Sequence, residues 1–228
     1  LGDVYKRQLY TDKDQSYVLY VLTQDQLAHT KFPLGGMDKP SIRKIAEEQG
    51  FCNARKHDSQ DICFVPDGDY VGFMERYTGK YYPDGDFLDV NGNVVGRHHG
   101  AVRYTCGQRK GLGIGGRRES LFILATDTAQ NVIYVGEGDA HPGLWRPALH
   151  IAPGKIHWVN PARTLSPGQS ARFSVRIRYR QPLQDATLFM RDQGAYILFD
   201  QPQRGITPGQ FAAWYDGDEL AGSGVISE

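Results

Sequence analysis

The sequence lacks net charge, paired cysteines and any long apolar run, and each absence excludes a class of protein. Its 26 basic and 26 acidic residues give a formal net charge of zero, so a nucleic-acid-binding surface would have to be a local basic patch. No apolar stretch approaches the length needed to cross a bilayer. We therefore expect neither a signal peptide nor a membrane anchor, and a cytoplasmic location.

Cysteine is scarce as well. Three cysteines, an odd number at uneven spacing, do not form a disulfide framework, which fits a reducing compartment and leaves at least one free thiol. Cys52 and Cys63 do not have CxxC spacing, and His98–His99 has no second ligand pair at metal-like spacing. We predict no metal site. Cys106 is interpreted as a packing residue.

What the sequence does contain is an ordinary globular composition over 228 residues, with 40% hydrophobic and 23% charged residues. This length can bury a substantial core and accommodates one large domain or two to three small ones. The stretch that bears most on function is HDSQDICFV, from His57 to Val65. Its polar run predicts a loop and its apolar run a short strand, so the Cys63 thiol would lie where a loop meets a rigid element. A nucleophile is one interpretation, and a buried core cysteine is the other.

The first quarter of the chain has an α/β pattern. Asp14 is a suitable cap for a helix over Gln15–Leu22, whose apolar run would lie against a sheet. Asp38 is a suitable cap for a second helix over 38–49, which Gly50 would end. Two helices followed by the Cys63 strand predict the end of an α/β domain.

The middle of the chain predicts a small α+β domain. Asn91–Gly92 lies between two short apolar runs, which is a strong hairpin signal, and LFILATD with VIYVGEG predicts a further pair of strands. The segment GQRKGLGIGG, from Gly107 to Gly116, is rich in glycine and basic residues. Its backbone amides could cradle phosphates, although it matches neither the Walker nor the dinucleotide pattern; a mobile basic loop is the alternative.

The last third of the chain predicts a barrel of six short strands, because closure removes exposed sheet edges. The strand ARFSVRIRYR alternates, so one of its faces would be polar and largely arginine. Such a face is either a solvated exterior or a phosphate-tracking surface with Tyr179 nearby for stacking. Its members are Arg172, Ser174, Arg176, Arg178 and Arg180.

Four segments in this order resemble the tRNA-specific 2-thiouridylase family. They are KDQSYVL at Lys13–Leu19, FPLG at Phe32–Gly35, DSQDICFV at Asp58–Val65, and GQRKGLGIGG. The resemblance implies three parts: residues 1–71 as the C-terminal part of an ATP-pyrophosphatase domain of the adenine nucleotide alpha hydrolase-like kind, 72–138 as a central domain, and 139–228 as a six-stranded β-barrel.

The resemblance also implies a reaction, the ATP-dependent 2-thiolation of the wobble uridine of tRNA. ATP would adenylate the C2 oxygen, and a persulfide on Cys63, loaded by an upstream sulfur-carrier protein, would supply the sulfur. The family's first catalytic cysteine would resolve Cys63 as a disulfide. Six residues match family positions that contact tRNA: Lys13, Asp14, Gln15, Arg178, Tyr179 and Gln210.

The sequence departs from the family at its start. The glycine- and serine-rich loop that holds the ATP phosphates is not in these 228 residues, so we expect a fragment that is inactive alone and binds ATP only with a further N-terminal part. LGDVYKRQ does not match the family pattern, and a foreign origin is one explanation for residues 1–8. The alternative function is a non-catalytic RNA-binding barrel module in which Cys63 belongs to the core.

Overall fold

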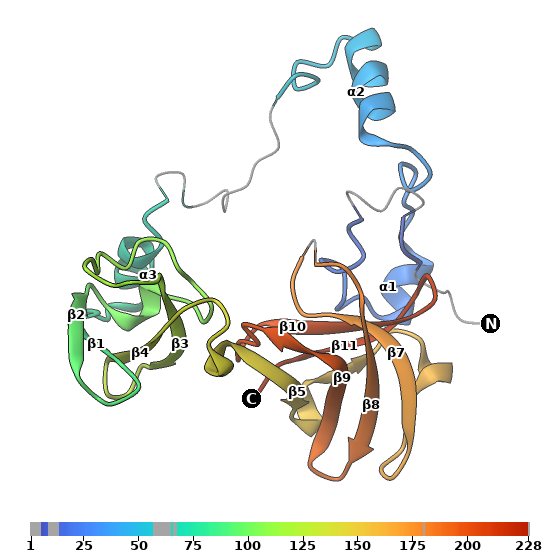
Figure 1. Cartoon of the computed structure of the whole chain (residues 1–228). Coiled ribbons are helices and arrows are strands. Elements are labelled where there is room, and N and C mark those ends of the chain that lie inside the picture. Colours follow the sequence, from blue (N-terminus) through green and yellow to red (C-terminus); the bar gives the residue numbers. More distant parts are fainter. Residues whose placement is uncertain (1–5, 9–13, 57–64, 66–67, 180, 228) are drawn as a thin grey trace. The chain divides into compact units, whose positions relative to one another are not determined.

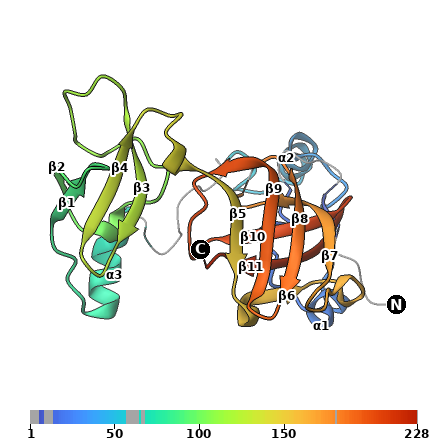
Figure 2. The same cartoon turned by 60° about the horizontal axis from the view of Figure 1, so that its bottom comes forward.

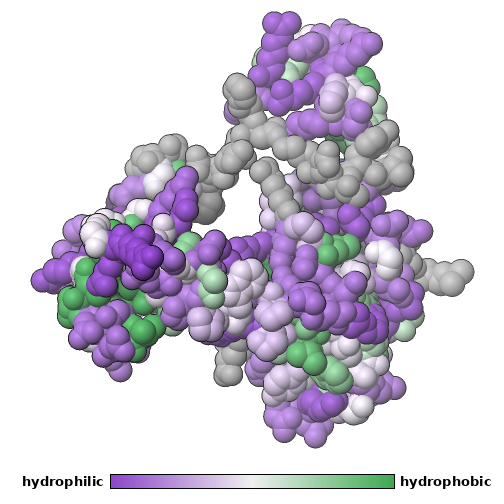
Figure 3. Space-filling model, viewed as in Figure 1, coloured by the Kyte–Doolittle hydropathy of each residue, from purple (hydrophilic) through white to green (hydrophobic). Residues whose placement is uncertain are grey.

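The computed structural model describes residues 6–8, 14–56, 65, 68–179 and 181–227 (Figure 1). The chain divides into two compact units: Leu1–Lys56 together with Pro147–Glu228, and His57–Arg146. Hydrophilic residues cover most of the surface in the view of Figure 3. Among the described residues, no helix has the length and apolar character that a membrane span requires.

The first unit contains a curled sheet of seven strands. They are β5 (Trp145–Ile151), β6 (Ile156–Trp158), β7 (Ser170–Arg176), β8 (Gln184–Arg191), β9 (Gly194–Arg204), β10 (Phe211–Asp216) and β11 (Glu219–Val225). The strand order is β5-β9-β8-β7-β10-β11-β6, and no ladder joins β5 to β6 among the residues described. Figure 2 shows β5, β9, β8 and β7 side by side, with β10 and β11 crossing behind them.

This sheet has seven strands instead of the six expected, because one predicted strand is divided into two. The segment HIAPGKIHWV is divided into β5 and β6 by a short 3-10 helix at Pro153–Lys155. Proline has a fixed φ and no amide hydrogen, so it cannot continue a ladder. The other five predicted strands are present. Strand β7 ends at Arg176, so Arg178 follows the strand instead of lying on it, and Arg180 falls outside the described residues.

The core of this unit comes from the inward face of the curled sheet. Val175, Leu188 and Ile197 are completely or almost completely buried, and Trp214 is the largest fully buried side chain. A Cβ placed on Gly222 would lie 2.6 Å from the indole nitrogen of Trp214. The glycine on β11 therefore provides the space that the indole occupies on the neighbouring strand, β10.

The helix predicted over Gln15–Leu22 is wrong. In residues 14–22, which we call the strap, successive turns span residues 16–21, and the first helix among the described residues is the short α1 (Gln24–Ala28). Aromatic and β-branched residues are weak helix formers, and here their side chains dock on the sheet. The predicted contact with a sheet is confirmed: Tyr17, Leu19 and Leu22 pack on a cluster of Leu27, Val159, Ala213, Tyr215 and Leu220.

The second predicted helix is confirmed as α2 (Lys39–Glu48). The Asp38 carboxylate accepts the Ser41 amide at 2.8 Å and caps the helix. Gly50 has a φ of +71°, and bonds from Gly50 N to Glu47 O and from Phe51 N to Ala46 O end the helix. The Asp38 cap and the end of the helix at Gly50, both predicted from the sequence, are therefore confirmed.

The second unit combines a helix with a mixed sheet, as an α+β arrangement. Helix α3 (Tyr70–Thr78), which the sequence did not predict, begins with Asp69 as its cap. The sheet order is β2-β1-β4-β3, with β1 parallel to β4. Both predicted hairpins are confirmed. The strands are β1 (Gly85–Leu88), β2 (Val94–His98), β3 (Leu121–Asp127) and β4 (Val132–Glu137).

Candidate nucleic-acid interface

The strap is held on the curled sheet by a buried carboxylate. Asp14 is 2% exposed, and its carboxylate accepts the backbone amide of Ser16 at 3.1 Å and the Ser16 hydroxyl at 2.7 Å. The Gln8 amide donates to the same carboxylate at 3.2 Å. Arg7 approaches it at 3.6 Å. Because the carboxylate is so enclosed, it organises the chain around it and offers little surface to a ligand.

The partner of Asp14 from the sheet is Arg176 at the end of β7. Their side chains approach to 3.4 Å, and Arg176 is 5% exposed. The guanidinium carbon lies 5.1 Å from the centre of the Tyr215 ring, and the Tyr215 hydroxyl lies 3.0 Å from Ser16 Oγ. Burial raises the pKa of Tyr215, so the ring stays neutral in this network.

The predicted arginine face of the β7 segment is therefore wrong in one respect. Arg176 lies inside the molecule and belongs neither to a solvated exterior nor to a phosphate-tracking surface. Arg172 does face solvent, but both of its terminal nitrogens donate to the Asp200 carboxylate at 2.6 Å. Both arginines of β7 thus pair with carboxylates. The alternation of polar and apolar residues in the sequence does not reveal these two ion pairs.

Beside the buried pair, the strap reaches a half-buried tyrosine. The Gln15 side-chain amide donates to the Tyr179 hydroxyl at 2.6 Å, between residues 164 positions apart in the chain. The Gln15 backbone amide also donates to the Gln8 side chain at 2.7 Å. Two of the predicted site residues, far apart in the sequence, are therefore in direct contact.

Arg178 and Gln210 flank the same region through the loop before β10. Arg178 donates to the carbonyl of Arg204 and, at 3.3 Å, to that of Gly205. Burial and the neighbouring Arg204 lower the pKa of Arg178. The loop then reaches Gln210, whose carbonyl accepts the Ile226 amide at 2.8 Å. Its backbone is thus fixed in the sheet.

The strap docks next to Gln210, on Phe211. The Tyr17 hydroxyl donates to the Phe211 carbonyl at 2.8 Å, and the Tyr20 and Phe211 ring centres lie 3.9 Å apart. Burial, together with Tyr20 and Tyr215, raises the pKa of Tyr17 to about 12. The strap, the turn after β7 and the loop before β10 therefore form one connected surface.

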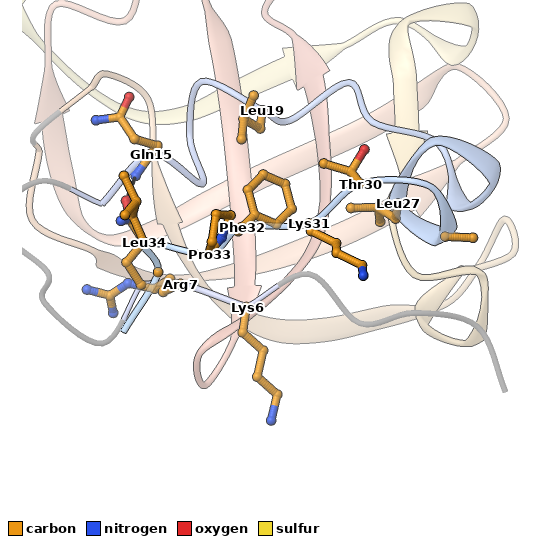
Figure 4. Close-up of a pocket in the computed structure, with 13 residues that line it drawn as sticks. Lys6, Arg7, Gln15, Leu19, Leu27, Thr30, Lys31, Phe32, Pro33 and Leu34 are labelled. Carbon is orange, nitrogen blue, oxygen red and sulfur yellow. Dashed lines mark hydrogen bonds between the residues drawn. The ribbon is translucent and has the colours of Figure 1, made fainter. Parts of the chain in front are cut away.

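A cavity of about 750 Å³ is lined in part by the strap residues Gln15 and Leu19. Figure 4 shows the Phe32 ring in the middle of the lining residues, with Gln15 on one side and Leu27 and Thr30 on the other. The FPLG segment, Phe32–Gly35, forms part of its wall, so two of the four segments that carried the family resemblance meet here. Among the described residues, the charged side chains in the lining are cationic: Lys6, Arg7 and Lys31.

In the second unit, the glycine-rich segment is tied to the sheet at its start. Gly107 N donates to Ile123 O at 2.7 Å, and Ile123 N donates to Gln108 O at 3.0 Å. Leu112 is buried in the core of the unit. A cavity of about 430 Å³ lies along the segment, with Arg109 in its lining. Both interpretations of the segment, a basic loop and a phosphate cradle, therefore stay open.

Comparison with known proteins covers nearly the whole chain. Family models match in three consecutive parts: the tRNA methyl transferase HUP domain at residues 3–67, the tRNA methyl transferase PRC-barrel domain at 71–137, and the aminomethyltransferase beta-barrel domain at 149–226. Proteins named tRNA-specific 2-thiouridylase MnmA from Christiangramia forsetii, Flavobacterium johnsoniae and Pseudomonas putida are 44%, 40% and 42% identical over 94–95% of this chain. The chain belongs to the tRNA-specific 2-thiouridylase family. It spans 57–62% of the length of these relatives.

For this member of the 2-thiouridylase family, the division into 1–71, 72–138 and 139–228 stays a prediction. The described strap and α1 pack on the barrel sheet within a single compact unit. Lys13 and Cys63 lie outside the described residues, so their roles also stay predictions. The structure brings together Asp14 with Arg176 and Gln15 with Tyr179, whereas Arg178 contacts the loop that leads to Gln210.

Neither the two described cysteines of this family member nor its His98–His99 pair belongs to a group that could hold a metal ion. Cys52 is exposed and Cys106 is half-buried, with a pKa raised by burial. The buried His98 ring lies 3.2 Å from the Asn131 carbonyl, and His99 lies 3.0 Å from the Asp84 carboxylate. Within the described ranges, no group of three or more His, Cys, Asp or Glu residues is arranged to hold a metal ion.

Proposed function

We propose that this chain serves the 2-thiolation of the wobble uridine of tRNA, with Cys63 as the residue that carries the sulfur. The observation that carries the proposal is the 2.6 Å hydrogen bond between Gln15 and Tyr179. By resemblance, each lies at a tRNA-contacting position. Curated relatives at 40–44% identity are named tRNA-specific 2-thiouridylases, which supports the same substrate here.

The surface around this hydrogen bond has the groups that RNA recognition uses. Gln15 supplies an amide for base edges, Tyr179 an aromatic ring for stacking, and Arg178 a guanidinium for phosphates. Each is held by a contact within the unit, so little side-chain freedom is lost on binding. A uridine must leave its stack to react, and an extensive tRNA-binding surface would offset that cost.

The proposed reaction needs an activated uridine and a soft nucleophile. ATP, as a substrate, would convert the C2 oxygen into an adenylate and so into a good leaving group. The terminal sulfur of a persulfide on Cys63 would then form the bond to C2, directly or after release as hydrosulfide, while AMP leaves. The S–S bond would break as the thiolate of the family's first catalytic cysteine forms a disulfide with Cys63. Sulfur suits this step because thiolates and persulfides are nucleophilic near neutral pH, where a hydroxyl is not.

Two further parts of the proposal come from the family resemblance. ATP would be bound with the help of a segment beyond these 228 residues, since the chain spans 57–62% of its relatives' length. A sulfur-carrier protein would load Cys63, and a second cysteine from the family's N-terminal half would resolve it as a disulfide. The setting would be the cytoplasm, where such thiols are kept reduced.

The test is to locate the transferred sulfur. After incubation of the chain with a persulfide donor, mass spectrometry should find one added sulfur on the peptide that contains Cys63. The variants Cys52→Ser and Cys106→Ser should retain it, and Cys63→Ser should lose it. In a preparation that thiolates tRNA, Cys63→Ser should abolish 2-thiouridine and leave tRNA binding near normal.

Sulfur found on Cys106 instead, or 2-thiouridine made by the Cys63→Ser variant, would reject the assignment. If Cys63 accepts no sulfur and the chain still binds tRNA, the result would favour the alternative function, a non-catalytic RNA-binding barrel with Cys63 in the core.

A further inference from the structure

We propose that Arg176 is a positioning residue that sets the place of Gln15 against Tyr179 from beneath the strap. The inference rests on the proposed function, because it concerns the surface that would contact tRNA. It also changes the role expected for Asp14, from a tRNA contact to the anchor that Arg176 holds.

Burial separates this pair from any ligand. Arg176 and Asp14 are 5% and 2% exposed, and Ser16 and Tyr215 are fully buried. A phosphate group could not reach the guanidinium without lifting the strap. The charge of Arg176 is instead directed at the Asp14 carboxylate at 3.4 Å, which in turn binds the amide and hydroxyl of Ser16.

Gln15 and Tyr179 on the surface are each joined through a short stretch of backbone to this buried pair. Gln15 lies between Asp14 and Ser16, the two strap residues of the buried network, so its backbone is held from both sides. Tyr179 follows Arg176 by three residues in the turn after β7. One short segment of the barrel thus supplies both the anchor of the strap and the hydroxyl that receives the Gln15 amide at 2.6 Å.

The pair is poorly suited to a purely stabilising role. The Nε of Arg176 is buried and has no hydrogen-bond partner among the described residues, which is costly. Buried ion pairs with unsatisfied groups contribute little net stability compared with apolar residues of similar volume. A charge pair does, however, impose one geometry on the strap, since the Asp14 carboxylate loses its contact with Arg176 if the strap shifts.

The experiment compares Arg176→Met with Arg172→Met in the 228-residue chain, measuring affinity for an unmodified tRNA transcript well below the melting temperature. Arg172 is a matched control, four positions earlier on β7 and paired with Asp200 on the surface. Arg176→Met should weaken tRNA binding about tenfold, as expected when a contact surface loses its preorganisation. Arg172→Met should leave the affinity within about twofold.

Two readouts separate positioning from direct contact and from simple destabilisation. The salt dependence of binding should keep its slope in Arg176→Met, because no phosphate contact is lost. Hydrogen exchange should accelerate in the strap while the amides of β8 stay protected. In the Arg176→Met background, Gln15→Ala should cause no further loss of affinity, although it weakens binding about threefold in the unmodified chain.

If Arg176→Met does not fold, Tyr215→Phe provides a milder test, because it removes only the hydroxyl that lies 3.0 Å from Ser16 Oγ. It should weaken tRNA binding about twofold, with faster exchange in the strap. Unchanged affinity in both variants, or an additive effect of Gln15→Ala, would overturn the inference. An unmodified chain that does not bind tRNA would instead reject the proposed function, and strap exchange would still test the role of Arg176.

Discussion

The strap and helix α2 have similar beginnings and different structures. Each starts with an aspartate whose carboxylate accepts a nearby backbone amide, from Ser16 at 3.1 Å and from Ser41 at 2.8 Å. Asp38 starts a helix of ten residues, none of which is buried. Asp14 starts a series of turns whose apolar side chains pack on a sheet. Local capping signals therefore determine structure where tertiary contacts do not compete with them.

Substituting each aspartate in turn should reveal the largest difference between the strap and helix α2. Asp14→Ala leaves the Arg176 charge buried without its partner, which should lower the free energy of unfolding by about 3–5 kcal/mol. Asp38→Ala removes only an exposed cap, so it should reduce the helicity of α2 and leave the barrel's unfolding midpoint unchanged. Urea unfolding followed by tryptophan fluorescence, to which the buried Trp214 contributes, measures the first effect, and far-UV circular dichroism measures the second.

Equal midpoints for the two variants would show that the strap is not anchored through its carboxylate. Asp14→Asn is the matched control, because it keeps the size of the side chain and an oxygen for the Ser16 amide. It should have an intermediate midpoint.

The same comparison shows what the sequence could predict. The two ends of α2 and the hairpin turn at Asn91–Gly92 depend on residues close in the chain, so turn and cap chemistry was sufficient. The division of β5 from β6 was also readable at Pro153, a proline inside a predicted strand. Missing it led to six strands where the structure has seven.

The parts that could not be predicted depend on distant residues. Nothing in the alternation of ARFSVRIRYR shows that Arg176 is buried while Arg172 is exposed, because the difference comes from the strap that covers the end of β7. The partner Asp14 lies near the other end of the sequence, and its position suggested a helix cap. Family resemblance located Gln15 and Tyr179 separately, and only the structure shows that they form a hydrogen bond.

Alkaline pH should weaken the docking of the strap and leave helix α2 unaffected, because tyrosines hold the strap and α2 contains none. Burial raises the pKa of Tyr17 from 10.0 to about 12, so the folded state favours the neutral phenol. The stabilisation from this shift is complete below pH 10, the pKa of an unfolded tyrosine, and is lost as pH rises from 10 to 12. Allowing for the partial exposure of the ring, the loss should be about 1 kcal/mol.

Absorbance near 295 nm, which follows tyrosinate formation, and urea unfolding between pH 9 and 11.5 provide the measurement. Tyr17→Phe should remove part of the pH dependence, since a phenyl ring does not ionise. Tyr196→Phe, a substitution in β9 away from the strap, should retain all of it. An identical pH dependence in all three proteins would mean that the strap is not held by a neutral Tyr17.

The smallest expected effect concerns Arg178, which lies just beyond the buried network and, unlike Arg176, is exposed. If its guanidinium contacts a phosphate, Arg178→Ala should weaken tRNA binding a few-fold and reduce the slope of log affinity against log salt by about one, because one counterion fewer is released. Arg178→Lys should keep the slope, since a lysine retains the positive charge. Arg178 also donates to the carbonyls of Arg204 and Gly205, so the unfolding midpoint of each variant must be measured in parallel. A lower midpoint with an unchanged salt slope would assign Arg178 to the support of this loop and leave Gln15 and Tyr179 as the RNA contacts of the surface.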